Sequence, residues 1–208
     1  MVLRRGCRHS GTMADAAPMD EMLVLSDGRA VRIRPMHSAD AAALVEMHEG
    51  FSARTVRRRF FSSMPHLSPD QARRFAEVDG TSRVALVAQD ISGALVAVAR
   101  YDCLAVHQSG SAAPAAAEVA IVVADDFQHH GLGVALLTRL IAVARAHGVD
   151  YFTADVLMEN RPMLATFTDA GLTYTAHADG GVVHVELPLR VVGAVTPAGP
   201  GQEPPQPP

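Results

Sequence analysis

The stretch VAIVVADDFQHHGLGVALLTRLIAVARAHG, from Val119 to Gly148, brings together the features that decide the fold. An apolar run typical of a buried strand leads into a turn with two aspartates, two histidines and two glycines, and a long amphipathic helix follows. The first N–H groups of a helix have no partner inside it, and they point outward with the positive end of the helix dipole behind them. The segment therefore predicts that an anion is held at the turn.

Two known glycine loops do not account for this turn. The dinucleotide fingerprint GxGxxG would begin at Gly131 and Gly133, but Leu136 stands where its last small residue belongs, and residues 124–130 separate the strand from the first glycine. A Walker loop requires a lysine, whereas all 18 basic residues of the chain are arginine. The two glycines instead indicate that a diphosphate approaches the main chain closely.

Composition limits the classes of protein that the chain can belong to. With 208 residues, of which 49% are hydrophobic, it is large enough for one domain with a sizeable core. A net charge of −4 argues against nucleic acid or an anionic membrane as a partner. Two cysteines make neither a disulfide framework nor a metal cluster, and the chain has no apolar run of about 18 residues. The N-terminal arginines are followed by polar residues, so export is not indicated. A cytoplasmic location is therefore expected.

The two ends of the chain differ from its middle. Residues 1–20 have no hydrophobic periodicity, and residues 191–208 are rich in proline and poor in apolar side chains. Both ends are expected to be disordered tails. The folded domain is predicted to span residues 21–190.

Hydrophobic periodicity and turn residues predict the order of the elements. In chain order they are a hairpin at 22–35 around an Asp-Gly turn, helices at 39–50, at 53–61 and from residue 68, two strands at 83–89 and 94–101, a flexible link at 107–116, a strand at 118–123, a helix at 132–147, a strand at 151–157, a short helix at 162–170 and a closing hairpin at 172–189. The third helix has a capping box formed by Ser68 and Gln71. Hairpins that flank one strand–helix–strand unit predict an α+β fold with a mixed sheet.

Two motifs in the chain resemble those of the GNAT superfamily of N-acetyltransferases. The first is QHHGLG, residues 128–133, which matches the turn (Q/R)xxGx(G/A) of that family. The second is NRPMLATFTDAGL, residues 160–172, and the order of elements over about 21–187 is also similar. The resemblance implies a twisted, mostly antiparallel sheet with a splayed central strand pair and about four helices.

The resemblance also implies the acyl donor, acetyl-CoA, with its diphosphate held by main-chain N–H groups of the turn. Backbone groups near the end of the splayed strand would face the pantetheine amides and the thioester carbonyl, and Asn160 would contact the pantetheine arm. The residues assigned in this way to the cofactor are Val122, Val123, Gln128, His129, His130, Gly131, Leu132, Gly133 and Asn160.

Glu118 matches the glutamate that related protein acetyltransferases use as a general base. A lysine ammonium is protonated at pH 7, so acetyl transfer to it requires a base. Partial burial beside Ala117 and Val119 would make Glu118 more effective, while without the family context it reads as a glutamate that faces solvent. Where the family often has a tyrosine that protonates the departing thiolate, this chain has Phe167, which is expected to be a packing residue.

Other conspicuous side chains have simpler interpretations. His129 and His130 are adjacent and lack a third ligand at zinc spacing, so no metal site is expected; His130 is a candidate to touch phosphate, and His129 should not adopt a positive φ. Asp125 and Asp126 are interpreted as a helix-entry cap and surface charge. The arginines at 57–59, 73 and 74 fit a solvated helix face, or alternatively a surface that binds an acidic protein or the 3′-phosphate of the cofactor.

The segments at 57–88 and 117–133 are similar to the acetyltransferase domain of bacterial protein lysine acetyltransferases that act on acyl-CoA synthetases. That similarity implies a protein lysine as the acceptor, and the chain is too short to include the fused regulatory domain that some of those enzymes carry. A small-molecule amine acceptor, such as a polyamine, an amino acid or a drug, remains an alternative. A third is an acyl-CoA-binding regulatory module without turnover. The oligomeric state is left open.

Overall fold

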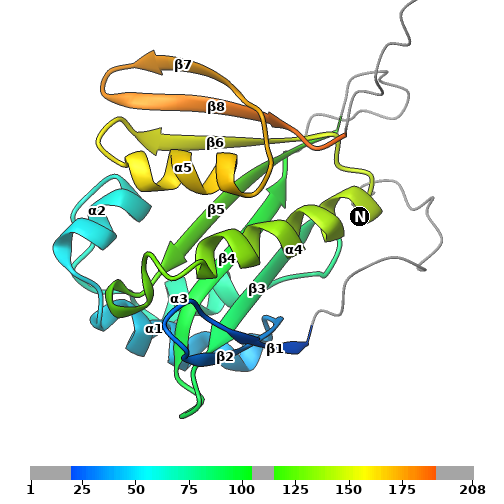
Figure 1. The fold of residues 1–208 in the computed structure, drawn as a ribbon. Coiled ribbons are helices and arrows are strands. Elements are labelled where there is room, and N and C mark those ends of the chain that lie inside the picture. Colours follow the sequence, from blue (N-terminus) through cyan, green and yellow to red (C-terminus); the bar gives the residue numbers. More distant parts are fainter. Residues whose placement is uncertain (1–19, 105–114, 191–208) are drawn as a thin grey trace, which may run out of the picture.

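The computed structural model describes residues 20–104 and 115–190. All strands of these residues belong to a single eight-stranded sheet (Figure 1). The strands are β1 (Glu21–Val24), β2 (Ala30–Pro35), β3 (Arg83–Gln89), β4 (Leu95–Cys103), β5 (Ala116–Val123), β6 (Tyr151–Leu157), β7 (Thr175–Asp179) and β8 (Val182–Pro188). The helices are α1 (Ala41–Glu49), α2 (Ala53–Phe60), α3 (Pro69–Ala76), α4 (Leu132–Ala146) and α5 (Arg161–Asp169). The strand order is β1-β2-β3-β4-β5-β6-β8-β7.

The sheet is antiparallel except at its centre, where β5 and β6 run parallel. Their pairing covers only residues 116–118 of β5 and 151–153 of β6, and the two strands then diverge. Figure 1 shows the resulting opening between the two arrows, with α2 near its wide end. The structure thus confirms the mostly antiparallel sheet and the splayed central strand pair.

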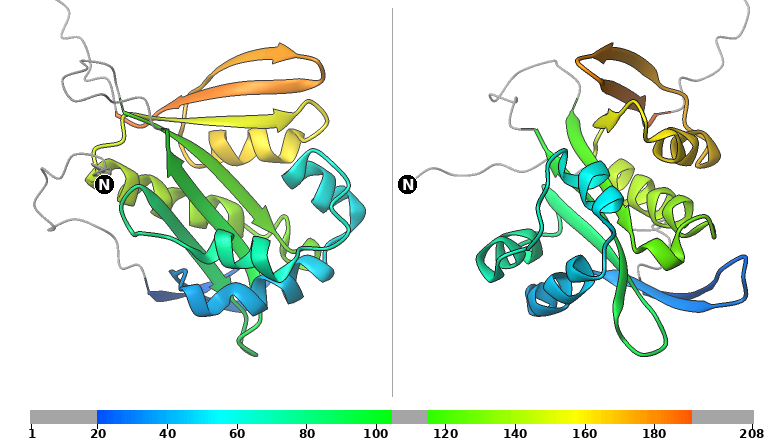
Figure 2. Two further views of the ribbon diagram at one scale, coloured as in Figure 1. Left: turned by 180° about the vertical axis from the view of Figure 1, so that it is seen from behind. Right: turned by 90° about the vertical axis from the view of Figure 1, so that its left-hand side faces the viewer.

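Helices cover both faces of the sheet, and a separate hydrophobic cluster lies on each face (Figures 1 and 2). The larger cluster includes Leu136, Leu137 and Leu140 of α4, all fully buried, together with Phe167 of α5. The smaller one joins α1 and α3 to the other face through side chains such as Leu44, Ala72 and Val98. Because strand side chains alternate between faces, β5 contributes to both layers.

Most of the elements predicted from the sequence are found. The hairpin turns at 28, 93 and 180–181 contain glycines with positive φ, and the capping box of Ser68 and Gln71 is formed. The described residues form five α-helices, where about four were expected. The flexible link expected at 107–116 lies mostly outside the described residues, as do the two predicted tails, except that Asp20 is described and pairs with Arg32 at 2.7 Å.

A buried ion pair joins the α1–α3 layer to the sheet. Arg34 of β2 donates two hydrogen bonds to the carboxylate of Asp40, at 2.8 and 2.7 Å, and both side chains are only 11% exposed. Asp40 also accepts from the main-chain N–H of His37 at 2.8 Å, directly before α1. Hydrogen bonding to Arg34 holds the pKa of the Asp40 carboxyl below its usual value despite burial. The pair therefore fixes where α1 begins relative to β2.

The substitution Asp40→Ala should lower the free energy of unfolding by about 3 kcal/mol, because it leaves the buried guanidinium of Arg34 without its counter-ion. Urea unfolding at pH 7 measures the effect. The matched control is Asp20→Ala, which breaks the exposed two-bond pair with Arg32 and should change stability little. Equal effects of the two substitutions would contradict the role given to the Arg34–Asp40 pair.

Candidate active site

The turn between β5 and α4 presents a row of unused main-chain donors. In the described part of the chain, no hydrogen bond uses the main-chain N–H groups from His129 to Val134 as donors; the first bond of α4 runs from Ala135 to Gly131, at 3.0 Å. The turn is well exposed at His129 and Gly131. Free N–H groups at the start of a 15-residue helix form a site for an anion.

The backbone of this turn twice enters the left-handed region. Gly131 has φ 83°, where a side chain would be strained, and His129 has φ 64°. The expectation that residue 129 avoids a positive φ is therefore wrong. Histidine is among the residues that tolerate this conformation better than most, and the path of the turn requires it. An added Cβ at Gly131 would meet no atom within 4 Å, so lack of space does not explain the glycine. The positive φ of this residue does.

The turn between β5 and α4, residues 124–131, is called the anion turn below. The turn at the tip of the β1–β2 hairpin packs against it. Arg29 donates to the main-chain carbonyl of Asp126 at 2.7 Å, and its guanidinium lies 4.0 Å from the centre of the Phe127 ring. Asp27 lies 3.4 Å from Nδ1 of His130. The imidazole of His130 is therefore directed at a carboxylate. Its position in the structure does not support the sequence-based suggestion that His130 touches phosphate.

The other side of the turn is held by the start of α2. The carboxylate of Asp125 accepts hydrogen bonds from the main-chain N–H and the hydroxyl of Ser52, at 2.9 and 2.6 Å, and from the hydroxyl of Thr55 at 2.9 Å. Gln128 donates from Nε2 to Thr55 Oγ1 at 3.1 Å and to the carbonyl of Val123 at 3.0 Å. The side-chain amide of Gln128 thus holds the turn in place by hydrogen bonds to α2 and to β5. Asp125 was expected to cap the start of α4, but its carboxylate accepts hydrogen bonds from the start of α2 instead.

The splay leaves one edge of β5 without a strand neighbour. Beyond Glu118, β5 pairs only with β4, where Val122 lies opposite Val98 and Val123 opposite Ala97. Ala116 and Ala124 direct their main-chain groups to β4, so Val122, which shares their parity along the strand, also uses its main-chain groups in the pairing with β4. The prediction that Val122 offers backbone groups to the cofactor is therefore wrong, and it is the main-chain N–H of Val123 that points toward the gap. Across the gap Asn160 begins α5, and within the described residues its side-chain amide makes no hydrogen bond. Val123 and Asn160, both predicted cofactor residues, therefore lie on the two sides of the opening.

Glu118 lies at the start of β5, on the face of the sheet that α1 and α3 cover. It is opposite Asp102 of β4, whose carboxylate takes two hydrogen bonds from Arg100, at 2.8 and 2.9 Å. Glu118 itself is exposed, so the partial burial expected from its apolar neighbours is not found. The reason is that Ala117 and Val119 point to the opposite face of the strand.

A half-buried arginine of α2 faces these carboxylates. Burial lowers the pKa of the Arg59 guanidinium to about 10, the nearby cation of Arg100 lowers it as well, and Glu118 and Asp102 act in the opposite direction. Arg59 and Arg100 also line a small apolar cavity of about 40 Å³ between α1, α3 and the sheet. The arginines at 57–59 are therefore not uniformly a solvated helix face, because Arg57 is exposed whereas Arg59 is half-buried.

Phe167 is fully buried in the larger hydrophobic cluster, with its ring edge-on to Tyr174 at 6.3 Å between centroids. This confirms the expectation that it is a packing residue. In the part of the chain that the structure describes, no group of three or more histidine, cysteine or acidic side chains is placed to hold a metal ion. No helix of the described ranges is long and apolar enough to cross a membrane.

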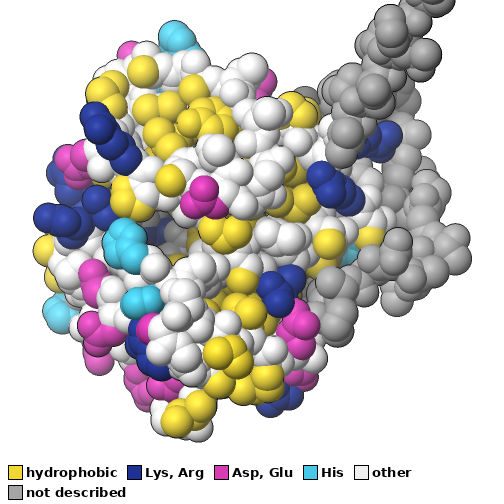
Figure 3. All heavy atoms as spheres, in the orientation of Figure 1, with side chains coloured by type: hydrophobic (Ala, Val, Ile, Leu, Met, Phe, Trp, Pro, Cys, Tyr) yellow, Lys and Arg dark blue, Asp and Glu magenta, His cyan; other side chains and the backbone are white. Residues whose placement is uncertain are grey.

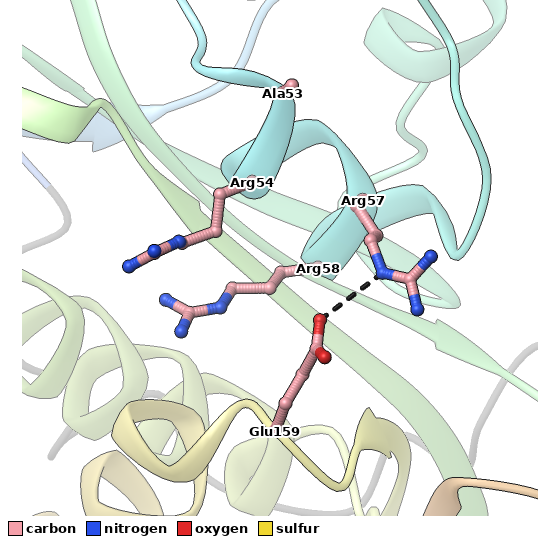
Figure 4. Close-up of a pocket in the computed structure, with 5 residues that line it drawn as sticks. All are labelled: Ala53, Arg54, Arg57, Arg58 and Glu159. Carbon is pink, nitrogen blue, oxygen red and sulfur yellow. Dashed lines mark hydrogen bonds and ion pairs between the residues drawn. The ribbon is translucent and has the colours of Figure 1, made fainter.

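The second cavity lies between α2 and the loop that follows β6. It has a volume of about 550 Å³ and is lined by Ala53, Arg54, Arg57, Arg58 and Glu159 (Figure 4). In Figure 3 the surface at the left is hollowed, with arginine side chains in dark blue beside histidines in cyan. The opening of the molecule next to the anion turn is therefore basic.

Comparison with known proteins agrees with this geometry. The GNAT domain of PAT from S. lividans is 39% identical, with a TM-score of 0.73 over 82% of this chain and 97% of that one. Acetyltransferase Pat of Mycolicibacterium smegmatis is 31% identical over 166 residues, and an acetyltransferase of Pseudomonas aeruginosa is 32% identical over 127 residues. These alignments cover 78% and 60% of this chain but only 47% and 64% of the respective relatives.

An anion turn beside a parted strand pair, within a mixed sheet, defines an acyltransferase of the acyl-CoA-dependent class. The model of the acetyltransferase (GNAT) family matches residues 47–172, more than half of the chain. The chain therefore belongs to the GNAT family, whose enzymes use acetyl-CoA as the acyl donor. The residues of the turn fit that donor, since their free main-chain N–H groups would suit its diphosphate, and β5 has no strand neighbour beyond Glu118 on the side where its pantetheine arm would lie.

Sequence reasoning missed the residues that hold the turn in place. Ser52 has the position of a helix N-cap, directly before α2, and this signal was available. Its partner Asp125 is 73 residues away, and no local pattern connects the two. Asp27 and Arg29 were expected only as part of a hairpin, and their contacts with the anion turn depend on how the sheet brings β1 and β2 beside α4.

The substitution Asp125→Ala should lower the free energy of unfolding by about 1–2 kcal/mol at pH 7, because three donors of α2 lose a charged acceptor. Burial by itself would raise the pKa of Asp125, but hydrogen bonds from Ser52 and Thr55 outweigh it and hold the pKa below 3.8. The stabilisation is therefore present above about pH 4 and is lost as the pH falls through the lowered value. Urea unfolding from pH 7 to pH 3 measures it. Asp126→Ala is the control, and an equal loss there would contradict the assignment.

Gly131→Ala should lower the free energy of unfolding by about 1 kcal/mol and weaken coenzyme A binding, because alanine disfavours φ 83° and relaxation moves the adjacent N–H groups. Gly50→Ala, after α1, is the matched control. Gly50 has an ordinary φ of −79° and an added Cβ there meets the carbonyl of Met47 at an ordinary 3.5 Å, so both stability and affinity should be retained. Thermal unfolding and calorimetry with coenzyme A test the pair, and identical behaviour of the two variants would contradict the strain argument.

Proposed function

We propose that the chain transfers the acetyl group of acetyl-CoA to the side-chain amine of a protein lysine, with Glu118 as the general base. The observation that carries this proposal is the arrangement of β5. The anion turn follows one end of this strand and Glu118 lies at the other end, beside the point where β5 and β6 part. Glu118 and Val123 are about 17 Å apart along the strand at 3.4 Å per residue, which an extended pantetheine arm can span.

Each residue of the site has a defined role in this proposal. The N–H groups from His129 to Val134 bind the diphosphate, and the main-chain groups of Ile121 and Val123 that point away from β4, together with the amide of Asn160, orient the pantetheine arm. When bound, acetyl-CoA supplies the acetyl group as a thioester. The carboxylate of Glu118 takes a proton from the acceptor ammonium, directly or through a water molecule.

The charges around Glu118 support this role. Arg59 and Arg100 lie on the same side of the sheet as Glu118 and Asp102, and Arg100 is paired with Asp102. Glu118 makes no such pair and is exposed, so its carboxylate is accessible to an amine that enters this region. The neutral amine is the nucleophile that acetyl transfer requires.

The same charges argue against a polyamine acceptor. A small polycation would need a closed acidic pocket, whereas the cavity beside α2 and the one between α1, α3 and the sheet are both lined by arginines. Asp102 is already paired with Arg100. Similarity to PAT of S. lividans and Pat of Mycolicibacterium smegmatis, together with the resemblance to bacterial protein lysine acetyltransferases, supports a protein acceptor, for which acyl-CoA synthetases are the first candidates.

The substitution Glu118→Gln should lower kcat about a hundredfold or more at pH 7 and leave coenzyme A binding unchanged, since only the proton acceptor is lost. Purified acyl-CoA synthetases serve as the acceptor panel, with release of free thiol followed over time. Because this chain contains no lysine, acetyl-lysine detected in the mixture comes from the acceptor alone.

Glu46→Gln, on the exposed side of α1, is the control and should keep full activity. Full activity of Glu118→Gln would contradict its role as the base. Binding of coenzyme A without thiol release from any protein or amine acceptor would instead favour a regulatory module without turnover.

A further inference from the structure

The basic cavity beside α2 contains two arginines whose charge the rest of the described chain leaves unbalanced. Arg57 pairs with Glu159 at 3.2 Å. Arg54 and Arg58 form no ion pair with the described residues, and Nε of Arg58 is buried there without a hydrogen-bond partner. Figure 4 shows Arg54 and Arg58 extending side by side into the opening, while Arg57 points toward Glu159.

A buried guanidinium nitrogen without an acceptor is unfavourable, and so is the clustering of three cations on two turns of one helix. An anion in the cavity would relieve both. A purely solvated helix face does not account for the buried Nε of Arg58 or for the parallel direction of the two side chains. The cavity is therefore suited to a ligand with several negative charges.

The position of the cavity identifies that ligand. The first turn of α2 is hydrogen-bonded to the anion turn through Thr55, which follows Arg54 directly and bonds to both Asp125 and Gln128. On the other side, Glu159 precedes Asn160 in the loop that enters α5. The cavity thus borders both the diphosphate end of the cofactor groove and its pantetheine wall.

The anion turn itself supplies no permanent cation. Residues 128–133 contain neither arginine nor lysine, and the imidazole of His130 faces Asp27. Main-chain N–H groups carry only partial charges, whereas the diphosphate and 3′-phosphate of the cofactor carry several full ones. Full positive charges must come from another element. Of the two elements bonded to the turn, the β1–β2 hairpin offers Arg29, which is paired with Asp27, so the unpaired arginines of α2 are the remaining source.

We propose that Arg54 and Arg58 bind the phosphate groups of acetyl-CoA from the α2 side of the groove, opposite the main-chain turn. The cofactor is then held between two elements, and its binding neutralises the repulsion within α2. The assignment is independent of the acceptor, because it concerns the donor alone. The competing occupant is an acidic segment of an acceptor protein, and the experiment below separates the two.

The test is calorimetry with coenzyme A and with pantetheine, which lacks the phosphates. The double substitution Arg54→Gln with Arg58→Gln should weaken coenzyme A binding at least about tenfold, because two charge-assisted contacts are lost, and should leave pantetheine binding unchanged. The affinity should also fall less between about 50 mM and about 200 mM salt than it does in the original chain. Arg74→Gln removes the same charge from the exposed side of α3 and should behave like the original chain.

Thermal unfolding of each variant verifies the fold, and the single substitutions Arg54→Gln and Arg58→Gln serve if the double variant is unstable. Unchanged affinity for coenzyme A would overturn the proposal. So would a rise in KM for an acceptor protein with no change in coenzyme A binding, because that result would assign the cavity to the acceptor. Failure of the unmodified chain to bind coenzyme A would overturn the donor site as a whole, and the acceptor proposal with it.

Discussion

The end of hydrogen bonding between β5 and β6 after their first three residue pairs is the constraint on which the rest of the structure depends. A central strand that loses its neighbour exposes main-chain groups that normally must be satisfied. The sheet nevertheless remains continuous, because β6 pairs along its whole length with β8, and β5 along its whole length with β4. The gap is therefore a stable feature of the fold, and it is positioned so that an extended ligand arm can complete the unpaired edge.

The anion turn is useful only if its N–H groups stay in one arrangement, and contacts from two directions maintain it. The β1–β2 hairpin holds it through Arg29, and α2 holds it through Ser52 and Thr55. Left-handed backbone at positions 129 and 131 is strained for most residues, so it persists where the surroundings fix it. The site is thus organised before the ligand arrives, which lowers the entropic cost of binding.

Sequence reasoning reproduced the fold because its signals are local. Alternating apolar residues, Asp-Gly turns and the capping box of Ser68 each determine a nearby element, and the two glycine-containing motifs identified the family. It failed where a property depends on the third dimension. The apolar neighbours of Glu118 do not bury it, because adjacent strand residues point to opposite faces. Asp125 was expected to cap the following helix, and only the folded chain brings it to Ser52. The positive φ of His129 follows from the path of the turn, which residue type alone did not reveal.

The most direct test of the account is the response of individual main-chain amides in solution. In a titration followed by ¹⁵N–¹H correlation spectroscopy, coenzyme A should shift the amide signals of residues 129–134 strongly, whereas pantetheine should leave them nearly in place and affect signals along the free edge of β5. Saturable binding of coenzyme A with those turn signals unmoved would show that the diphosphate lies elsewhere, and it would contradict the central claim.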